Sequence, residues 1–147
     1  MKQEIVEILL VEDNVSDEKL VKRAFNKANI ISRLKVVRDG AEALDFIFGS
    51  GVYKGRNINQ LPKFVMLDLK LPKVNGLEVL KKIRENKTTA MLPVVMFTSS
   101  QEVSDILNCY QSGANSYIVK PIDFGDFVAA VTGIGSYWTS LNKTVLN

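Results

Sequence analysis

The 147-residue sequence predicts one doubly wound α/β domain, in which five helices cover both faces of a five-stranded parallel sheet. The first observation is that short apolar runs alternate with longer segments whose apolar residues recur at helical spacing. The second is that the short runs are rich in Ile, Val, Leu and Phe, which is typical of strands buried on both faces. The third is composition, because 46% apolar and 24% charged residues match an ordinary globular domain.

The apolar runs define five candidate strands, each followed by a helical segment. They are Ile5–Val11, Leu34–Val37, Phe64–Leu67, Pro93–Phe97 and Ser116–Val119. This repeating order favours parallel pairing, because a helix between two strands returns the chain to the same end of the sheet.

Capping residues mark the ends of the first two predicted helices. The first helix has Asn14 or Ser16 available as its N-cap, and the second runs from about Ala41 to Phe48 with Gly49 as its C-cap. The apolar residues of the first helix recur at 3.6-residue spacing and therefore share one face. They are Leu20, Val21, Ala24, Phe25 and Ala28.

The third and fourth helices are predicted from shorter patterns. The inner stripe of the third helix consists of Leu77, Leu80 and Ile83. In the fourth helix, Ser99 and Glu102 have the spacing of a capping box. The apolar residues that follow this box, and that we expect to face the core, are Val103, Ile106 and Leu107.

The fifth helix carries an apolar stripe that is interrupted near its end. Gly133 and Gly135 each cost about 1 kcal/mol relative to alanine inside a helix, so we expect the last turns to be weak. The stripe consists of Phe127, Val128, Val131, Ile134 and Trp138. The irregular segment Gly49–Pro62 is interpreted as a surface loop rather than a linker between domains.

The chain contains no histidine and a single cysteine, Cys109. These counts exclude Ser-His and Cys-His catalytic pairs, histidine metal clusters, an internal disulfide and a CxxC site on this sequence. Cys109 is predicted to be a small buried apolar side chain without a chemical role. Any chemistry on this chain must therefore use carboxylates, hydroxyls and amines.

Nineteen basic and sixteen acidic residues give a net charge of +3, which specifies no partner. A basic cluster is interpreted as the solvated face of the third helix, so we expect no nucleic acid partner. It comprises Lys81, Lys82, Arg84 and Lys87. The N-terminal apolar run Ile8–Val11 is too short for a signal peptide or a membrane span. We therefore expect a cytoplasmic protein that does not bind a membrane.

Polar residues directly follow four of the predicted strands. Because the carboxyl ends of parallel strands meet at the edge where doubly wound sheets bind ligands, these side chains are expected to converge. They are Glu12 and Asp13 after the first strand, Asp68 after the third, Thr98 and Ser99 after the fourth, and Lys120 after the fifth. Three carboxylates, a hydroxyl and an amine would then share one site.

This residue set suits phosphoryl transfer. Closely packed carboxylates repel one another unless a cation is present, and their hard oxygen atoms suit Mg²⁺. With that ion offsetting the charge of a phosphoryl group, Asp68 is expected to act as the nucleophile and to form an aspartyl phosphate. Lys120 would pair with phosphoryl oxygens, and Thr98 would donate a hydrogen bond to another.

Each of these residues also has a structural explanation. Taken alone, Asp13 is best explained as a helix N-cap, Thr98 as a strand-end hydroxyl and Lys120 as a solvated lysine. Capping explains Asp68 poorly, because the next predicted helix begins several residues later. Agreement among four strand ends favours one shared site over four separate coincidences.

Four segments together resemble the receiver domain of two-component response regulators, over about Ile5 to Ser136. They are ILLVEDN, VMLDLKLPKVNGLEVL with Asp68, VVMFTSS with Thr98, and GANSYIVKP with Tyr117 and Lys120. The resemblance implies a flavodoxin-like receiver fold of the chemotaxis-regulator type, with strand order 2-1-3-4-5. It also implies that a sensor histidine kinase phosphorylates Asp68. The chain would then be a phosphoacceptor rather than an enzyme, with residues 1–147 forming one receiver domain without an output module.

The resemblance also assigns a metal site. Mg²⁺ would be held by Asp13, Asp68 and the backbone carbonyl of Lys70, with Glu12 acting mostly through water. Lys70 and Ser100 stand at positions where the family varies residues that influence how water reaches the acyl phosphate. A lysine at position 70 predicts slow self-dephosphorylation.

The same resemblance implies a conformational switch. Tyr117 would turn inward when Thr98 moves toward the phosphoryl group, and Lys120–Pro121 would be a cis peptide bond that aims the lysine into the site. Phosphorylation would then change the surface made by the fourth helix, the fifth strand and the fifth helix.

The Gly49–Pro62 loop and the C-terminal segment resemble small response regulators paired with phytochromes, which implies a phytochrome-like kinase. We interpret residues 136–147 as an extension of the last helix. Its apolar side chains are expected to cover either this domain or a second copy of it. They are Tyr137, Trp138, Leu141, Val145 and Leu146. Self-packing and homodimerisation, the latter through this extension or the surface of the switch, both stay open.

Two other functions compete with this interpretation. A Mg²⁺-dependent phosphohydrolase of the haloacid dehalogenase type also uses an aspartate nucleophile, but it would need a second aspartate where Lys70 stands. A receiver-like interaction module that works without phosphorylation would usually have lost one of three residues that this chain retains. They are Asp13, Asp68 and Lys120.

Overall fold

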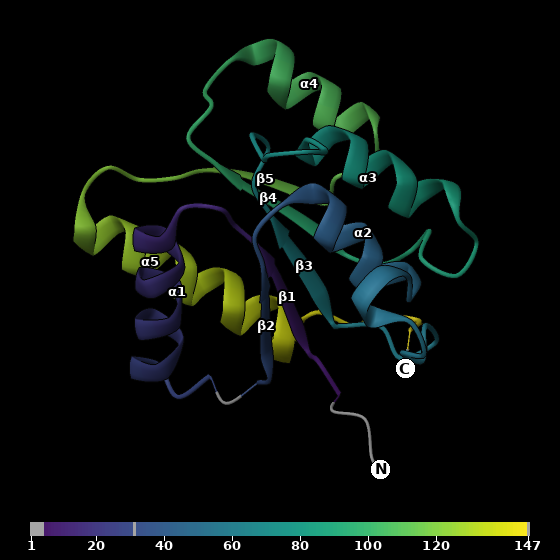
Figure 1. The fold of residues 1–147 in the computed structure, drawn as a ribbon. Coiled ribbons are helices and arrows are strands. Elements are labelled where there is room, and N and C mark those ends of the chain that lie inside the picture. The colour runs from purple at the N-terminus through teal and green to yellow at the C-terminus, as the bar shows by residue number, and fades with distance from the viewer. Residues whose placement is uncertain (1–4, 31, 147) are drawn as a thin grey trace.

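The computed structural model describes residues 5–30 and 32–146, which form a parallel sheet with helices on both faces (Figure 1). The strands are β1 (Ile8–Val11), β2 (Leu34–Val37), β3 (Phe64–Leu67), β4 (Val94–Thr98) and β5 (Ser116–Val119). The helices are α1 (Val15–Lys27), α2 (Gly40–Phe48), α3 (Gly76–Glu85), α4 (Val103–Gln111) and α5 (Phe124–Ser136). The strand order β2-β1-β3-β4-β5 confirms the predicted doubly wound fold.

Three strands have the predicted limits, and two differ. β1 begins at Ile8 rather than at Ile5, which is 54% exposed. β4 is displaced by one residue, because Pro93 accepts a hydrogen bond from the Val65 N–H but has no N–H of its own to donate. The outer strands β2 and β5 are largely half-buried, so burial on both faces holds only for the three central strands.

Alternate residues of the central strands point to opposite faces of the sheet and form two cores. Leu9 and Val65 pack with side chains of α2, α3 and α4. Leu10 and Met66 pack with side chains of α1 and α5 on the other face. Two apolar cores therefore hold the strands in register, and their carboxyl ends lie at one edge of the sheet (Figure 1).

Side-chain caps begin four of the five helices. At the start of α1, Asn14 rather than Ser16 is the N-cap, and its Oδ1 accepts a hydrogen bond from the Asp17 N–H at 3.0 Å. The other side-chain caps are Asp39, Asn75 and Asp123. Gly49 adopts a left-handed conformation with φ 66° and ends α2, as predicted.

Helix α4 does not follow its predicted pattern. The capping box of Ser99 and Glu102 is wrong, because Glu102 is the N-cap residue but makes no side-chain capping bond. Val103 and Leu107, expected in the core, are 78% and 53% exposed, and Cys109 is the buried residue of this helix. The misassignment arose because the 3.6-residue pattern of α4 supports more than one inward face.

Helix α5 continues through both glycines and ends at Ser136. A Cβ atom on Gly135 would lie 2.6 Å from the Phe25 ring of α1. Glycine therefore permits a close approach of α1 and α5, which offsets its low helix propensity. A single π-helical turn, Tyr137–Leu141, follows the helix.

The C-terminal extension packs against its own domain through two of its five apolar residues. The Trp138 ring lies 6.4 Å from the Phe64 ring, and Leu146 contacts the core beside α2 and α3. Leu141 and Val145 remain 71% and 77% exposed. Self-packing thus accounts for part of the extension only.

Arg84 is not part of the solvated basic face that we predicted for α3. Its guanidinium is half-buried and donates hydrogen bonds to the carbonyls of Gly113 and Leu92 and to the side chain of Asn115. These bonds join α3 to the segments that flank β4 and β5. The neighbouring Lys81, Lys82 and Lys87 are exposed, as expected.

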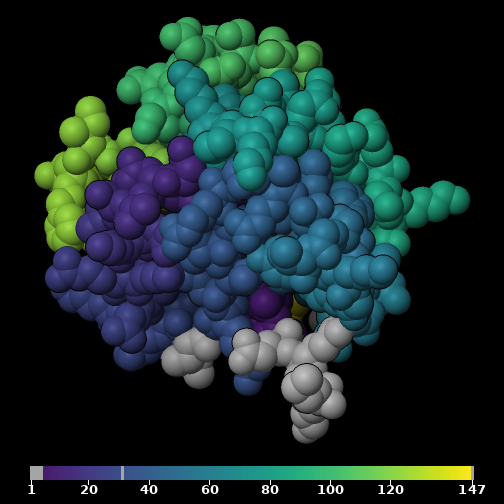
Figure 2. Space-filling model, viewed as in Figure 1, coloured from purple at the N-terminus to yellow at the C-terminus, as the bar shows by residue number. Residues whose placement is uncertain are grey.

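The segment between α2 and β3 is a surface loop, as predicted, with one short 3-10 helix, Gly51–Tyr53. Arg56 attaches it to α2 by donating from Nε to the Phe46 carbonyl at 2.5 Å and from Nη2 to the Ile47 carbonyl at 3.1 Å. Its guanidinium also lies 4.2 Å from the centre of the Phe46 ring. In Figure 2 the loop forms a continuous surface with α2.

Among residues 5–30 and 32–146, the longest apolar helical stretches fall short of what a bilayer crossing requires.

Candidate functional site

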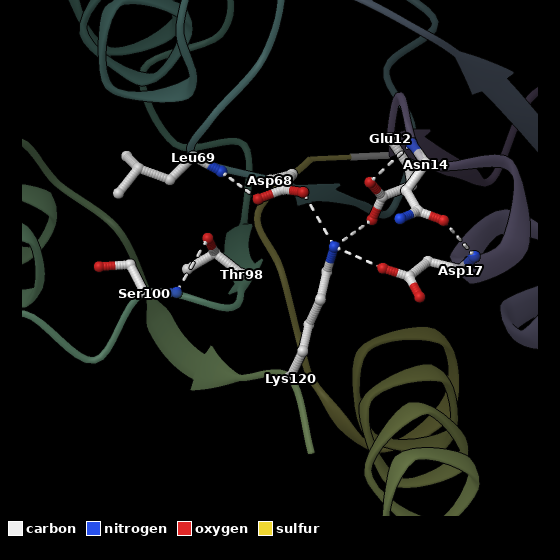
Figure 3. A network of polar contacts seen from close by, with 8 residues as sticks. All are labelled: Glu12, Asn14, Asp17, Asp68, Leu69, Thr98, Ser100 and Lys120. Atoms are coloured by element: carbon white, nitrogen blue, oxygen red, sulfur yellow. Dashed lines mark hydrogen bonds and ion pairs between the residues drawn. The ribbon is translucent and has the colours of Figure 1, made fainter. Parts of the chain in front are cut away.

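The carboxyl ends of four strands place four buried polar side chains at one edge of the sheet (Figure 3). The backbone N–H of Asp68 donates to the Val11 carbonyl at 3.1 Å, and that of Lys120 donates to the Thr98 carbonyl at 2.7 Å. These bonds extend the sheet ladder by one residue and fix where the side chains emerge. The four residues and their exposed fractions are Glu12 (1%), Asp68 (8%), Thr98 (1%) and Lys120 (9%).

Lys120 is at the centre of the site. Its Nζ lies 2.7 Å from Glu12 Oε1, 2.9 Å from Asp68 Oδ2 and 2.9 Å from Asp17 Oδ2. These three contacts match the three N–H donors of an ammonium group. The sequence prediction that Lys120 joins the carboxylates is therefore confirmed by the geometry, and the solvated-lysine alternative is wrong.

The pKa values show which charge is in excess. Burial raises the pKa of Glu12 to about 7, and the charge of Asp68 acts in the same direction against the opposing effect of Lys120. Burial alone would lower the pKa of Lys120, but hydrogen bonds to Asp17, Glu12 and Asp68 outweigh it and hold this pKa above its usual value. The ammonium is therefore charged at neutral pH and shared by more carboxylates than it can neutralise.

Backbone groups fix both the side chain and the main chain of Asp68. Its Oδ1 accepts a hydrogen bond from the Leu69 N–H at 2.7 Å, while Oδ2 faces Lys120. The Gly76 N–H donates to the Leu69 carbonyl at 2.7 Å, and a Cβ atom at position 76 would overlap the Asp68 carbonyl oxygen. Glycine at the start of α3 therefore permits α3 to pack closely against the backbone of Asp68.

The acidic residues also fit a divalent cation. Glu12, Asp13 and Asp68 each offer one carboxylate oxygen, and these oxygens lie within 4.8 Å of one another. Such a set of hard oxygen ligands suits a Mg²⁺-like or Mn²⁺-like ion better than a soft metal. Asp13 is exposed, so the ion would face solvent on that side and keep bound water.

An open cavity of about 330 Å³ adjoins this acidic cluster. Asp13, Asp68, Thr98 and Lys120 line it, so the structure brings the predicted phosphoryl-binding groups together at one surface. Lys70 also lines the cavity with an exposed side chain. Its backbone carbonyl as a metal ligand stays a prediction.

The two predicted switch residues meet at the loop between β4 and α4. Thr98 Oγ1 accepts a hydrogen bond from the Ser100 N–H at 3.5 Å, and the Tyr117 hydroxyl donates to the Ser100 carbonyl at 2.9 Å. Ser100 Oγ in turn donates to Asp105 Oδ2 of α4 at 2.5 Å. Ser100 therefore connects Thr98, Tyr117 and α4.

Sequence reasoning missed Asp17, the third carboxylate on Lys120. The residue was hidden because an acidic side chain in the first turn of a helix is explained by the helix dipole alone. The available signal was position, since α1 begins directly after the acidic pair at the edge where the site lies. Asn14, which caps α1, also donates its backbone N–H to Glu12 Oε2 at 3.2 Å.

The predicted cis peptide bond is wrong. Lys120–Pro121 is trans, the form that a peptide bond before proline usually prefers. From this backbone the Lys120 side chain already reaches its three carboxylates, so a cis bond is not needed to aim it.

Comparisons with known proteins identify similar sequences and folds. A family model described as the response regulator receiver domain matches residues 8–132. The probable methanogenesis regulatory protein FilR2 of Methanothrix harundinacea is 39% identical over 137 residues, which cover 93% of this chain and 86% of FilR2. The response regulator Rcp1 of Synechocystis sp. is 36% identical over 131 residues, which cover 89% of this chain and 87% of Rcp1.

Two solved structures share the fold over nearly their whole length. The Mn²⁺-bound form of Rcp1 aligns with a TM-score of 0.86 and 34% identity, covering 94% of this chain and 97% of that structure. The phosphorylated cyanobacterial phytochrome response regulator RcpA aligns with a TM-score of 0.87 and 33% identity, covering 95% and 98%. Similar proteins have thus been crystallised with a divalent metal and in a phosphorylated form.

Proposed function

This chain belongs to the family of response regulator receiver domains, and from that membership we propose that Asp68 accepts a phosphoryl group from the phosphohistidine of a sensor kinase. The likeness to phosphorylated RcpA supports a phosphoacceptor role in signalling. The observation that carries the assignment to Asp68 is the placement of its buried carboxylate 2.9 Å from a charged ammonium, at the end of β3.

In the proposed transfer, an Asp68 carboxylate oxygen forms a bond to phosphorus while the bond between phosphorus and the donor imidazole nitrogen breaks. The electron pair of the broken bond stays on that nitrogen, and a donor protonated on its other nitrogen leaves as neutral imidazole. Lys120 donates a hydrogen bond to a phosphoryl oxygen and offsets the charge that develops there. The Thr98 hydroxyl, also at the cavity, donates to another.

A divalent ion, which we propose to be Mg²⁺, would be held by Asp13, Asp68 and the backbone carbonyl of Lys70, with Glu12 acting mostly through water, and would offset the negative charge of the phosphoryl group. The Lys70 side chain lies at the open side of the cavity, where it would hinder water from reaching phosphorus. Slow self-dephosphorylation is therefore part of the proposal.

The response to phosphorylation is proposed to begin at the loop between β4 and α4. When Thr98 turns to the phosphoryl group, its bond with the Ser100 N–H is lost, and the carbonyl of the same residue is the one that Tyr117 holds. A change at Ser100 would therefore reach Tyr117 and α4 together. The surface of α4, β5 and α5 would then differ between the two states.

The partner is a histidine kinase, as the two-component family implies, and we propose that it is phytochrome-like because RcpA is a phytochrome response regulator. We propose that the protein acts in the cytoplasm as one receiver domain, with neither nucleic acid nor membrane as a partner. A homodimer would use the exposed Leu141 and Val145 of the extension or the surface of α4, β5 and α5.

The proposal is tested by incubating the protein with acetyl phosphate, with and without Mg²⁺, and measuring its intact mass. Wild type should gain one phosphoryl group only when the metal is present, and Asp68→Asn should gain none. Asp45→Asn, which alters a carboxylate of α2 away from the cavity, should behave like wild type. Equal phosphorylation of wild type and Asp68→Asn would overturn the assignment.

A further inference from the structure

Lys120 has no N–H donor to spare. Its ammonium group carries three donors, and Glu12, Asp17 and Asp68 each accept one of them (Figure 3). If Lys120 is to bind a phosphoryl oxygen, as the proposed function requires, one of these carboxylates has to release it. The hydrogen-bond count alone thus predicts an exchange of partners at this lysine.

The three carboxylates differ in how easily they can leave. Asp68 stays beside Lys120 when it carries the phosphoryl group, but its carboxylate charge passes to the phosphoryl oxygens, and these oxygens then compete with the other two carboxylates for the ammonium. Glu12 is 1% exposed and belongs to the acidic cluster, and the Asn14 N–H holds its other oxygen at 3.2 Å, so its side chain stays inside the site rather than turning to solvent. The Asp17 side chain is 22% exposed and can exchange the ammonium for water.

Asp17 also has a second source of stabilisation that does not depend on Lys120. It lies in the first turn of α1, where the positive end of the helix dipole favours a negative charge. Its backbone N–H is held by Asn14 Oδ1 at 3.0 Å, so the residue keeps its place when the side chain turns outward. Release of Asp17 is therefore the least costly of the three.

We propose that Asp17 is a positioning residue that occupies the place of a phosphoryl oxygen on Lys120 in the unphosphorylated protein and is displaced by it. This inference rests on the proposed function of Asp68. Before phosphorylation, Asp17 keeps the ammonium inside the cavity. After phosphorylation, its carboxylate at the start of α1 loses its ammonium partner.

The proposal predicts that Asp17 competes with the phosphoryl group. Loss of its charge weakens the resting partner of Lys120, so a phosphoryl analogue should bind more tightly to Asp17→Asn than to wild type. Because the Asp17 side chain is partly exposed, we expect about a 3- to 10-fold change in affinity, which is less than a fully buried charged hydrogen bond would give. Asp17→Glu, which keeps the carboxylate, should stay closer to wild type.

The test is a titration of the full chain with beryllofluoride in the presence of Mg²⁺, followed by ¹⁹F NMR. Asp126→Asn is the matched control, because Asp126 lines the adjoining cavity with Lys120 but forms no ion pair with a described residue. It should bind beryllofluoride as wild type does. Thermal unfolding of each variant establishes that it is folded before titration.

Each outcome of the titration either supports or overturns the displacement of Asp17. Tighter binding by Asp17→Asn alone supports displacement. Weaker binding would mean that Asp17 still holds Lys120 in the complex, and equal tightening by Asp126→Asn would mean that only overall charge matters; either overturns the proposal, as does an unchanged affinity. If folded wild type binds no beryllofluoride, the function proposed for Asp68 fails, and the displacement of Asp17 fails with it.

Discussion

Lys120 and Arg84 are two cations withdrawn from solvent at opposite ends of strands β4 and β5, and their partners differ in charge. Lys120 contacts three carboxylates. Arg84 donates from Nε to the Gly113 carbonyl at 2.9 Å, from Nη1 to the Leu92 carbonyl at 2.6 Å and from Nη2 to Asn115 Oδ1 at 2.8 Å. All of these acceptors of Arg84 are neutral.

The charge of the partners distinguishes a cation in a functional site from a cation that only connects parts of the fold. Burial lowers the pKa of Arg84, and its neutral acceptors satisfy the guanidinium without leaving a net negative charge nearby. At Lys120 the carboxylates outnumber the ammonium, so the pKa of this lysine lies above its usual value and the remaining negative charge can attract a metal ion. The excess of charge, rather than burial itself, marks the functional cation.

The largest expected effect is the loss of phosphorylation when the functional cation is removed. In Lys120→Met, the phosphoryl oxygens lose a buried charged donor, and the rate of phosphorylation by acetyl phosphate should fall by about 1000-fold. Intact mass measured over time gives the rate. Lys63→Met is the control, because Lys63 forms its ion pair with Glu7 at the opposite end of the sheet, and it should keep the wild-type rate. A Lys120→Met protein that is phosphorylated normally would remove the distinction between the two cations.

Removal of the structural cation, Arg84, should lower stability while leaving phosphorylation nearly unchanged. Arg84→Ala leaves several backbone carbonyls without their donor, and the free energy of unfolding should fall by about 3 kcal/mol, or roughly 150-fold in the folding equilibrium. Phosphorylation by acetyl phosphate should change by less than about 2-fold under conditions where the variant is folded, since effects at separate sites are nearly independent. Urea unfolding measures the first quantity.

The neighbouring Lys82 provides the control for this experiment. It is exposed on the same helix, and Lys82→Ala should change stability by no more than about 0.5 kcal/mol. A comparable loss of stability in both variants would show that the helix, rather than the carbonyl contacts of Arg84, accounts for the effect.

The same comparison explains how much of the site could be predicted from the sequence. Lys120 and Asp68 were predicted because each directly follows an apolar run, so fold topology alone brings them together. Arg84 was misassigned because its acceptors are backbone carbonyls, and carbonyl groups leave no mark in the sequence. Asp17 was missed because its sequence position has an adequate local explanation in the helix dipole.

The fold shows a similar limit. The sheet order was predictable from alternating elements, and the inward stripe of α5 was correct at Phe127 and Val131. The stripe of α4 was wrong at Val103 and Leu107, because its short pattern does not specify one inward face. Gly135 illustrates a further limit. Glycine is unfavourable inside a helix, but at this position it permits close contact with Phe25 of another helix, which the sequence does not reveal.

Cys109, which lies between Arg84 and Lys120 in the sequence, is a buried group that carries no charge. Burial, and to a smaller degree the charge of Asp105, raises the pKa of its thiol to about 11. Because the reactive form is the thiolate, which increases with pH, little of it exists at pH 8. Alkylation by iodoacetamide at pH 8 should be about 100-fold slower in the folded protein than in urea. The rate is followed by intact mass, and rapid labelling of the folded protein would contradict the burial of Cys109.

The smallest expected effect concerns Tyr117, which forms a bond to a neutral acceptor close to the charged site. Tyr117→Phe removes the 2.9 Å bond to the Ser100 carbonyl and should lower the free energy of unfolding by about 1 kcal/mol, measured in urea. Tyr137→Phe, which alters an exposed tyrosine of the extension, should be close to neutral. Phosphorylation by acetyl phosphate should be unchanged in both, because the hydroxyl contacts the loop rather than Asp68. A slower rate in Tyr117→Phe alone would mean that the neutral bond and the charged site are coupled, so that charge excess alone does not delimit the site.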